Sequence, residues 1–269
     1  MAANFAARGA WPTITGAVSL ESLKVVTYNI KSGIYHPDGL DAIVRVLEPL
    51  EADVIGLQEV DRGTRRSRGE DQTALLARRL GMPYYQFGPA TPWEGGGEYG
   101  VALLSRHPLE STEVVPLWVP TGKDATPGER EPRVALCARL HEPRVRLLVT
   151  HLGLTREQRL RQTEQLVGIA DASAEPVVLM GDLNGRPDDP EILYLCDRMC
   201  DSLGHLPEEE RITFPSGDPE LHEEDFLART LDYVFVSSRD GIVVSSRVVA
   251  EHTLASDHNP LEAQLAVSV

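Results

Sequence analysis

Short runs of apolar and β-branched residues alternate along the chain with longer segments in which apolar residues recur at helical spacing. LKVVTYNI (23–30) and DVIGLQEV (53–60) are typical of buried strands. TREQRLRQTEQLVGIA (155–170) predicts a helix that begins with a capping box formed by Thr155 and Gln158. A chain that alternates strands and helices in this way folds by burying sheets beneath helices.

The alternation continues over the rest of the chain. Residues 38–50 and 71–82 predict further helices, the first with Asp38 as its N-cap. Because each half of the chain mixes strands with helices, we expect an α/β fold, a four-layer αββα sandwich of two packed mixed β-sheets. The remaining strands are predicted at 99–109, 133–140, 144–152, 175–184, 229–237, 241–250 and 260–267.

The domain organisation follows from where periodicity is missing. Residues 1–20 show no apolar period and predict a flexible N-terminal leader. No linker rich in Pro, Gly or Ser divides the remainder, so residues 21–269 predict a single domain. Long loops in compact domains tend to carry function. Three are expected here, at 88–98, 118–132 and 204–229.

Charge and composition exclude several classes of protein. The net charge of −15 argues against a broad basic surface for nucleic acid, yet it is compatible with a nuclease whose acidic residues hold metal ions. No run approaches the roughly 18 apolar residues of a membrane span, and no signal peptide is recognisable, so we expect a cytoplasmic protein without a transmembrane segment. Cys137, Cys196 and Cys200 lack zinc-site spacing, and the last two are predicted to be core residues of one helix.

Polar residues stand repeatedly at the ends of the predicted strands, where strand propensity does not require them. Taken singly, each has an ordinary interpretation as a turn former, a solvated strand end or a helix-entry residue. Taken together, their carboxylates, amides and imidazoles, with no cysteine among them, are the hard ligands that suit Mg²⁺ or Mn²⁺. The residues are Asn29, Glu59, His151, Asp182, Asn184, Asp257 and His258.

Such a set of side chains suits the hydrolysis of phosphate esters. A divalent ion neutralises charge on the phosphorus, a carboxylate orients or deprotonates water, and a cationic histidine protonates the leaving oxygen. The chain contains neither a Gly-x-Ser-x-Gly nucleophile motif nor a Walker A loop. The sequence therefore favours attack by water over a covalent intermediate.

The same stretches resemble the endonuclease/exonuclease/phosphatase superfamily of metal-dependent phosphoesterases, which includes folds of the DNase I and sphingomyelinase type. The resemblance rests on seven motifs in the family's order within residues 23–267, and it implies a four-layer sandwich with its site between the two sheets. The motifs are VVTYNIKSG, VIGLQEVD, YGVALLSRHPL, LLVTHLGL, VVLMGDLNGRP, TLDYVFVS and ASDHNPL.

The resemblance also implies which residues hold a metal ion and which act on phosphate. Glu59 is similar to the family's principal metal ligand, with Asn29 beside it and Asp257 as the second carboxylate. For the chemistry, Asp182 would orient or activate the attacking water, Asn184 would hold that water or a phosphate oxygen, and two histidines would contact the phosphate from opposite sides. These are His151 and His258, the latter oriented by Asp232.

Alternatives remain for several of these positions. Asp232 could instead form a buried pair with an arginine, and the arginines at 62–68 are either a substrate contact or a solvated loop. Many similar bacterial sequences have Asn where Val101 stands, so one polar contact near the metal is either missing here or supplied by Glu98 or Tyr99. The predicted substrate contacts are Arg62, Tyr99, Arg130 and Arg133.

The function that follows is a Mg²⁺- or Mn²⁺-dependent hydrolase of phosphodiester or phosphomonoester bonds. A nuclease-like substrate is preferred to a phospholipid of the sphingomyelinase type, because no apolar hairpin for membrane insertion is evident. TFPS (213–216) resembles a motif of small bacterial family members with varied substrates. The rival is a non-catalytic binding module on the same fold. No protein partner is predicted.

Overall fold

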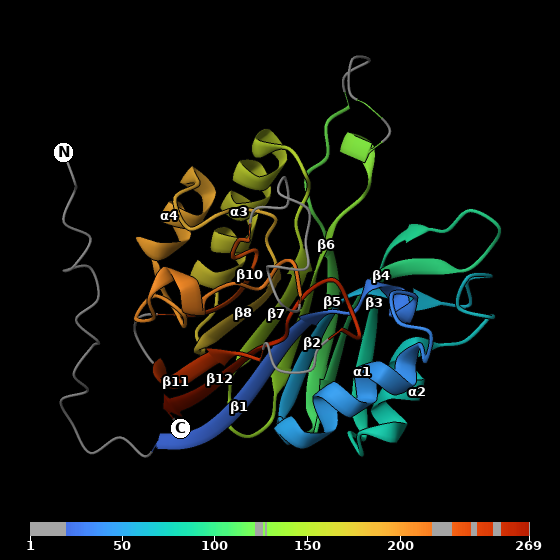
Figure 1. The fold of residues 1–269 in the computed structure, drawn as a ribbon. Helices are drawn as coiled ribbons and strands as arrows, with labels where there is room; N and C mark the ends of the chain where they lie inside the picture. The colour runs from blue at the N-terminus through green and yellow to red at the C-terminus, as the bar shows by residue number, and fades with distance from the viewer. Residues whose placement is uncertain are drawn as a thin grey trace.

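Two mixed six-stranded sheets pack face to face, with helices on both outer faces (Figure 1). The computed structural model describes residues 20–121, 126, 128–216, 228–237, 241–249 and 254–268. The first sheet has the order β11 (Gly241–Val248), β12 (Leu261–Ser268), β1 (Leu20–Asn29), β2 (Val54–Arg62), β4 (Glu98–Ser105) and β3 (Tyr84–Pro92). The second has β5 (Leu109–Pro116), β6 (Val134–Leu140), β7 (Arg146–His151), β8 (Val177–Asp182), β10 (Asp232–Ser237) and β9 (Met199–Asp201).

The helices divide between the two sheets and complete the predicted αββα sandwich. Helices α1 (Leu40–Leu47) and α2 (Gln72–Arg79) pack on the first sheet through one apolar cluster. Helices α3 (Arg156–Asp171) and α4 (Pro190–Cys196) pack on the second through another. Short 3-10 turns join the elements, namely η1 (Lys31–Gly33), η2 (Glu48–Leu50), η3 (Gly128–Arg130) and η4 (Glu208–Glu210).

A third apolar cluster fills the space between the sheets and holds them together. Val25 and Val54 of the first sheet belong to the same cluster as Val149 and Met180 of the second. A Cβ atom added at Gly56 would lie 3.1 Å from the Val149 side chain. The strands β2 and β7 can therefore approach closely only because residue 56 has no side chain.

One parallel pair of strands lies near the centre of each sheet, and this arrangement brings the polar strand ends together. Strand β1 runs parallel to β2, and β7 runs parallel to β8. Strands β12 and β10 run antiparallel to their neighbours β1 and β8, so they begin at the edge where those neighbours end. The carboxyl ends of four strands and the starts of two others therefore share one edge of the sandwich.

Several local expectations are corrected by the structure. Helix α1 has Gly39 as its N-cap, with φ of 58°, because the Asp38 side chain pairs instead with Arg45. The capping box of Thr155 and Gln158 on α3 is confirmed. None of the helices in the described part of the chain combines the length and hydropathy needed to cross a membrane.

The loops also differ from expectation. Residues 88–92 continue β3, which pairs with β4, so only 93–97 remain as a hairpin loop. β1 already includes Leu20, assigned to the leader, whereas residues 1–19 lie outside the described residues. Within the expected loop 118–132 the structure describes η3, and residues 122–125 and 127 lie outside the described residues. Within 204–229 it describes η4 and a bridge between Phe214 and Arg229, and residues 217–227 lie outside the described residues.

The expected helical cysteine pair is wrong. Cys196 ends α4 and is exposed, whereas Cys200 lies in the strand β9 and is partly buried. A short helix followed directly by a short strand has the same apolar content as one longer helix, so periodicity alone did not separate the two. Cys137 is buried in β6, and all three cysteines are free thiols.

The charge of Asp201, at the end of β9, is predicted to destabilise the fold at neutral and higher pH. Burial raises the pKa of its carboxyl group to about 6, although the Leu203 amide and the Arg211 guanidinium favour the charged form. Because the folded-state pKa exceeds the unfolded value near 3.9, stability is lost as the pH rises from about 4 to 6. Asp201→Asn retains an acceptor for the Leu203 amide and is expected to gain about 1–2 kcal/mol at pH 8.

Thermal unfolding of the Asp201→Asn variant at pH 8 and pH 4 tests this prediction. The gain in Tm should be present at pH 8 and much smaller at pH 4, where Asp201 is protonated in the folded state and about half protonated in the unfolded state. Asp171→Asn, which changes an exposed carboxylate at the end of α3, is the matched control and should give no such pH-dependent difference. An equal gain at both pH values would contradict the buried-charge explanation.

Candidate active site

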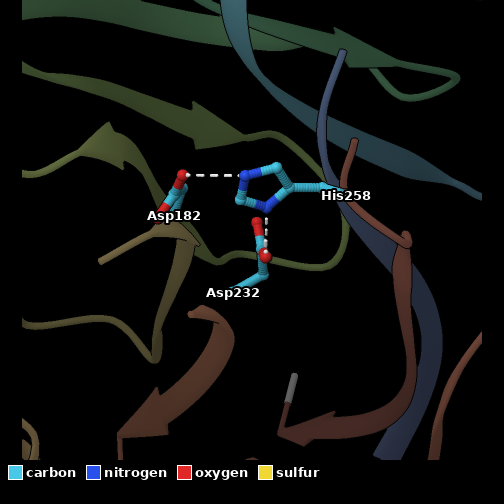
Figure 2. Close-up of side chains that lie close together, drawn as sticks. All are labelled: Asp182, Asp232 and His258. Carbon is cyan, nitrogen blue, oxygen red and sulfur yellow. Dashed lines mark hydrogen bonds and ion pairs between the residues drawn. The ribbon is translucent and has the colours of Figure 1, made fainter. Parts of the chain in front are cut away.

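His258 lies between two buried carboxylates at the shared strand edge (Figure 2). Its Nδ1 is 2.8 Å from Asp232 Oδ2, and its Nε2 is 3.7 Å from Asp182 Oδ2. Asp232 begins β10 and Asp182 ends β8, and the two residues are direct partners across the antiparallel pair. The structure thus places Asp232 against the imidazole of His258, as the resemblance implies. No arginine is paired with Asp232 among the described contacts.

Burial and neighbouring charge set the protonation of this group. Burial alone disfavours a cationic imidazole, but the Asp232 and Asp182 carboxylates outweigh it and raise the pKa of His258 to about 9. Burial, together with the charge of Asp232, raises the pKa of Asp182 above its usual range. His258 is therefore a cation at neutral pH, and Asp182 is a carboxylate that accepts a proton more readily than an exposed one.

His151, at the end of β7, is in the opposite protonation state. Its Nε2 is 3.4 Å from Asp182 Oδ2, and its Nδ1 has no hydrogen-bond partner among the described residues. Burial, together with the positive charges of Arg133 and His258, holds the pKa of His151 well below its usual value. Tyr99 and Arg133 line a small cavity with His151, so the structure brings these two predicted contacts to the site.

The residues expected to hold a metal ion lie beside this group. The Asn29 amide donates to Glu59 Oε1 at 3.1 Å and to Asp182 Oδ2 at 3.0 Å. The Lys31 ammonium lies 3.0 Å from Asp257 Oδ2 and 4.0 Å from Glu59 Oε1. A cation is therefore already favoured between Glu59 and Asp257. Carboxylate and amide oxygens are donors that fit Mg²⁺ or Mn²⁺, so these residues fit a divalent ion.

For Glu59 and Lys31, burial and the neighbouring charges shift the pKa in opposite directions. Burial raises the pKa of Glu59, while the Lys31 ammonium and the Asn29 amide partly offset the effect. Partial burial disfavours the Lys31 ammonium, but Glu59 and Asp257 outweigh it and raise the pKa of Lys31. A carboxylate whose charge is disfavoured by burial and favoured by a neighbouring cation, as that of Glu59 is, suits a cation-binding site.

The group formed by Asp182, Asp232 and His258 also has the spacing of metal ligands. Atoms of Asp182, Asp232 and His258 lie within 4.8 Å of one another, close enough to ligate one ion. However, the hydrogen bond to Asp232 and the high pKa of His258 favour the protonated imidazole, and a protonated nitrogen is no ligand. The arrangement around His258 is therefore better suited to proton transfer than to metal binding.

A segment with no predicted catalytic residue holds the site together. The hydroxyl of Thr213 accepts hydrogen bonds from the amides of Leu231 and Asp232, and the ring of Phe214 packs 4.8 Å from that of His258, centroid to centroid. The Ser216 amide donates to the Asp257 carbonyl oxygen. TFPS thus positions Asp232, Asp257 and His258, a role that the sequence motif alone did not indicate.

Ser256 is a further functional position that sequence reasoning missed. It is fully buried, and its hydroxyl donates to the backbone oxygen of Asn29 at 2.7 Å. This bond ties the segment before β12 to the end of β1. The only signal available in the sequence was the position of Ser256 beside Asp257.

Left-handed backbone at residues other than glycine is concentrated at the site. Glu59 has φ of 54° at the irregularity in the pairing of β2 with β4, and Asn184 has φ of 52° two residues after β8 ends. The Asn184 amide donates to Asp182 Oδ1 at 2.9 Å, while its side chain donates to the Leu152 carbonyl oxygen. Such conformations cost free energy and persist where surrounding contacts enforce them.

The remaining predicted substrate contacts are placed elsewhere. Arg62 forms an ion pair with Glu98 and lies 4.4 Å above the ring of Phe87, so its described contacts are within the first sheet. Arg130 lies in the exposed turn η3. Arg66, from the same arginine cluster as Arg62, pairs with the fully buried Asp61 at 2.7 Å, which makes this cation structural.

Comparisons with known proteins agree with this geometry. The sequence profile of the Endonuclease/Exonuclease/phosphatase family matches residues 26–258. A comparison with curated protein sequences gave no significant match. An endonuclease/exonuclease/phosphatase structure from Beutenbergia cavernae DSM 12333 is 26% identical, with a TM-score of 0.73, and covers 92% of this chain and 72% of that chain.

More distant structures share the fold. A mannosyl-6-phosphatase from Bacteroides thetaiotaomicron VPI-5482 is 17% identical, has a TM-score of 0.65 and covers 90% of this chain and 99% of its own. The human Nocturnin catalytic domain is 19% identical, has a TM-score of 0.67 and covers 92% of this chain and 94% of its own. From the family profile, which spans most of the sequence, the chain belongs to the endonuclease/exonuclease/phosphatase family of phosphoesterases.

Proposed function

We propose that the protein hydrolyses phosphodiester bonds with the help of a bound Mg²⁺ or Mn²⁺ ion. One observation carries the proposal: a continuous series of polar contacts connects the cation site to the cationic histidine. It runs from Glu59 through the Asn29 amide to Asp182, and from Asp182 to His258, which Asp232 holds. An ion pair that only stabilises the fold does not require that the pKa of its carboxylate and the pKa of its histidine both be raised. Here both are raised, in Asp182 and in His258.

Glu59, Asp257 and Asn29 are the residues that would hold the ion. Its chemistry would be to neutralise charge on the phosphate and to lower the pKa of a water molecule. Two carboxylates and an amide oxygen are a donor set of the type that magnesium and manganese sites use. Burial raises the pKa of Glu59 although Lys31 partly offsets the effect, so a further cation at this carboxylate would favour its charged form.

The other residues would divide the proton transfers between them. Asp182 would take a proton from the attacking water as the new P–O bond forms, and the Asn184 amide keeps Asp182 in place. His258 would give its proton to the leaving oxygen as the old P–O bond breaks. His151, which is neutral, would donate a hydrogen bond to a phosphate oxygen without bringing a second cation next to His258.

The substrate we place first is a nucleic-acid backbone. Arg65 and Arg68 are exposed in the loop that follows Glu59, and the described part of the chain records no ion pair for either. Their guanidinium groups are available for the phosphates of a polymeric substrate. Hydrolysis of phospholipid headgroups or of phosphomonoesters is the alternative that the same screen would reveal.

Hydrolysis of bis(p-nitrophenyl) phosphate tests the proposal. Protein stripped with EDTA should be inactive, and Mg²⁺ or Mn²⁺ should restore turnover. His258→Ala, purified in parallel, controls for contaminating phosphatases. Single-stranded DNA, RNA, phosphatidylcholine vesicles and p-nitrophenyl phosphate, each with both metals, would then rank the substrate classes. Turnover that EDTA does not reduce, or no turnover of any phosphoester, would overturn the proposal and favour a binding module.

A further inference from the structure

The Lys31 ammonium lies beside the two carboxylates that would hold the divalent ion. It lies 3.0 Å from Asp257 Oδ2 and 4.0 Å from Glu59 Oε1. The side chain is 41% exposed, so the ammonium can be displaced toward solvent without opening the core. It therefore weakens the binding of a divalent ion to these carboxylate oxygens without excluding it, because the two like charges repel each other.

The backbone conformation at Lys31 fixes the position from which this side chain extends. Lys31 and Ser32 are consecutive left-handed residues, with φ of 48° and 50°. The Lys31 amide donates to Asn29 Oδ1, one of the predicted metal contacts, at 3.1 Å. Two successive strained residues persist only where other contacts enforce them.

Those enforcing contacts come from a buried network behind Lys31. The Ser32 hydroxyl accepts a hydrogen bond from Arg66 at 2.7 Å and lies 3.3 Å from Asp61. The Gln72 side chain donates to the Ser32 carbonyl oxygen at 2.6 Å. Residues of β2 and α2 thus fix the turn that carries Lys31, which a freely solvated surface lysine would not require.

The number of cations at the site follows from its charges. Glu59 and Asp257 provide two negative charges, and one ammonium with one divalent ion already exceeds them. Asp182 and Asp232 add two negative charges and His258 adds one positive charge, so one divalent ion together with Lys31 and His258 already balances the four carboxylates, and a second divalent ion would leave the site positive. The Lys31 ammonium therefore neutralises the carboxylates as a second ion would, but with a single positive charge.

We propose that Lys31 is a built-in second cation, which shares the Glu59 and Asp257 carboxylates with one divalent ion and limits the site to that single ion. The proposal rests on the metal-dependent function proposed above and specifies the stoichiometry of the same site. Lys31 acts here through the carboxylates and the ion, so it is a positioning residue.

Isothermal titration of the full-length protein with Mn²⁺ tests the proposal without reference to activity. The parent should bind one ion per chain. Lys31→Gln should bind the first ion more tightly, on the order of tenfold, because a neighbouring positive charge is removed. It should also show a second, weaker binding event. Lys31→Arg retains the charge and should bind one ion, as the parent does.

Arg45→Gln is the matched control for the loss of one positive charge. Arg45 lies on α1 and pairs with Asp38, both exposed, so its variant should titrate like the parent. Two ions on the parent, or unchanged stoichiometry and affinity in Lys31→Gln, would overturn the role of Lys31 while leaving a metal-dependent hydrolase intact. A parent that binds no Mn²⁺ would overturn both proposals.

Discussion

His258→Ala is expected to lower kcat for bis(p-nitrophenyl) phosphate by about 10³-fold or more, within the range of losing a general acid together with its charge. In the structure this imidazole is the cation that contacts both Asp232 and Asp182. Without it the negative charge that develops on the phosphate and the leaving oxygen would lose its neighbouring cation. Mn²⁺ binding should be retained, since Glu59 and Asp257 contact Lys31 rather than His258. Steady-state kinetics and isothermal titration measure the two effects.

The control for this variant is His36→Ala, which removes a partly exposed histidine from the segment before α1 and should leave kcat unchanged. Because His258→Ala leaves Asp232 buried and unpaired, its Tm should be measured as well. Asp232→Asn, which retains a hydrogen-bond acceptor, should also lower kcat while disturbing the fold less. Turnover of folded His258→Ala at the parent rate would contradict the assignment of His258 as the acid.

Glu59→Gln is expected to weaken Mn²⁺ binding by about a hundredfold or more. Changing a residue that only supports a metal ligand typically weakens metal binding by about 10- to 100-fold, and Glu59 is expected to be a ligand itself. Glutamine preserves the size of the side chain and an acceptor for the Asn29 amide, so the change removes mainly the charge. Activity at low metal concentration should be lost, and a high concentration of Mn²⁺ should restore part of it. Titration and the metal dependence of kcat distinguish lost binding from lost chemistry.

The matched control is Glu98→Gln, which neutralises a partly exposed carboxylate on the neighbouring strand β4, where it pairs with Arg62. Its Mn²⁺ affinity should match that of the parent. Because burial already disfavours the Glu59 charge, Glu59→Gln should fold at least as well as the parent. A Glu59→Gln variant with parental Mn²⁺ affinity would move the metal site elsewhere, with the oxygens of Asp182 and Asp232 as the next candidates.

Much of the fold could be predicted from the sequence because its signals are local. Strands β1, β2, β7 and β8 are short apolar runs, and the capping box of α3 lies within four consecutive residues. Strands β3 and β5 were missed because both are largely polar and accessible, so neither shows a buried apolar run. β3 also contains Pro89 and Pro92, which argue against a strand when pairing is unknown.

The site was predictable only in its strand-end residues. Asn29, Glu59, Asp182 and His258 stand out because a polar residue interrupts or borders an apolar run. Lys31, Ser256 and the TFPS segment do not, since their importance depends on partners far away in the chain. The bond from Ser256 to the Asn29 backbone, for example, spans 227 residues.

The sequence by itself determined the alternation of strands and helices and the polar residue at each strand end, because periodicity and residue chemistry are properties of neighbouring residues. Only the tertiary structure decided that, of two histidines of similar local context, one is cationic and the other neutral. His258 is placed between two carboxylates, whereas His151 is buried near Arg133. The protonation state depends on burial and on charges a few ångströms away, and these exist only once the two sheets have packed together.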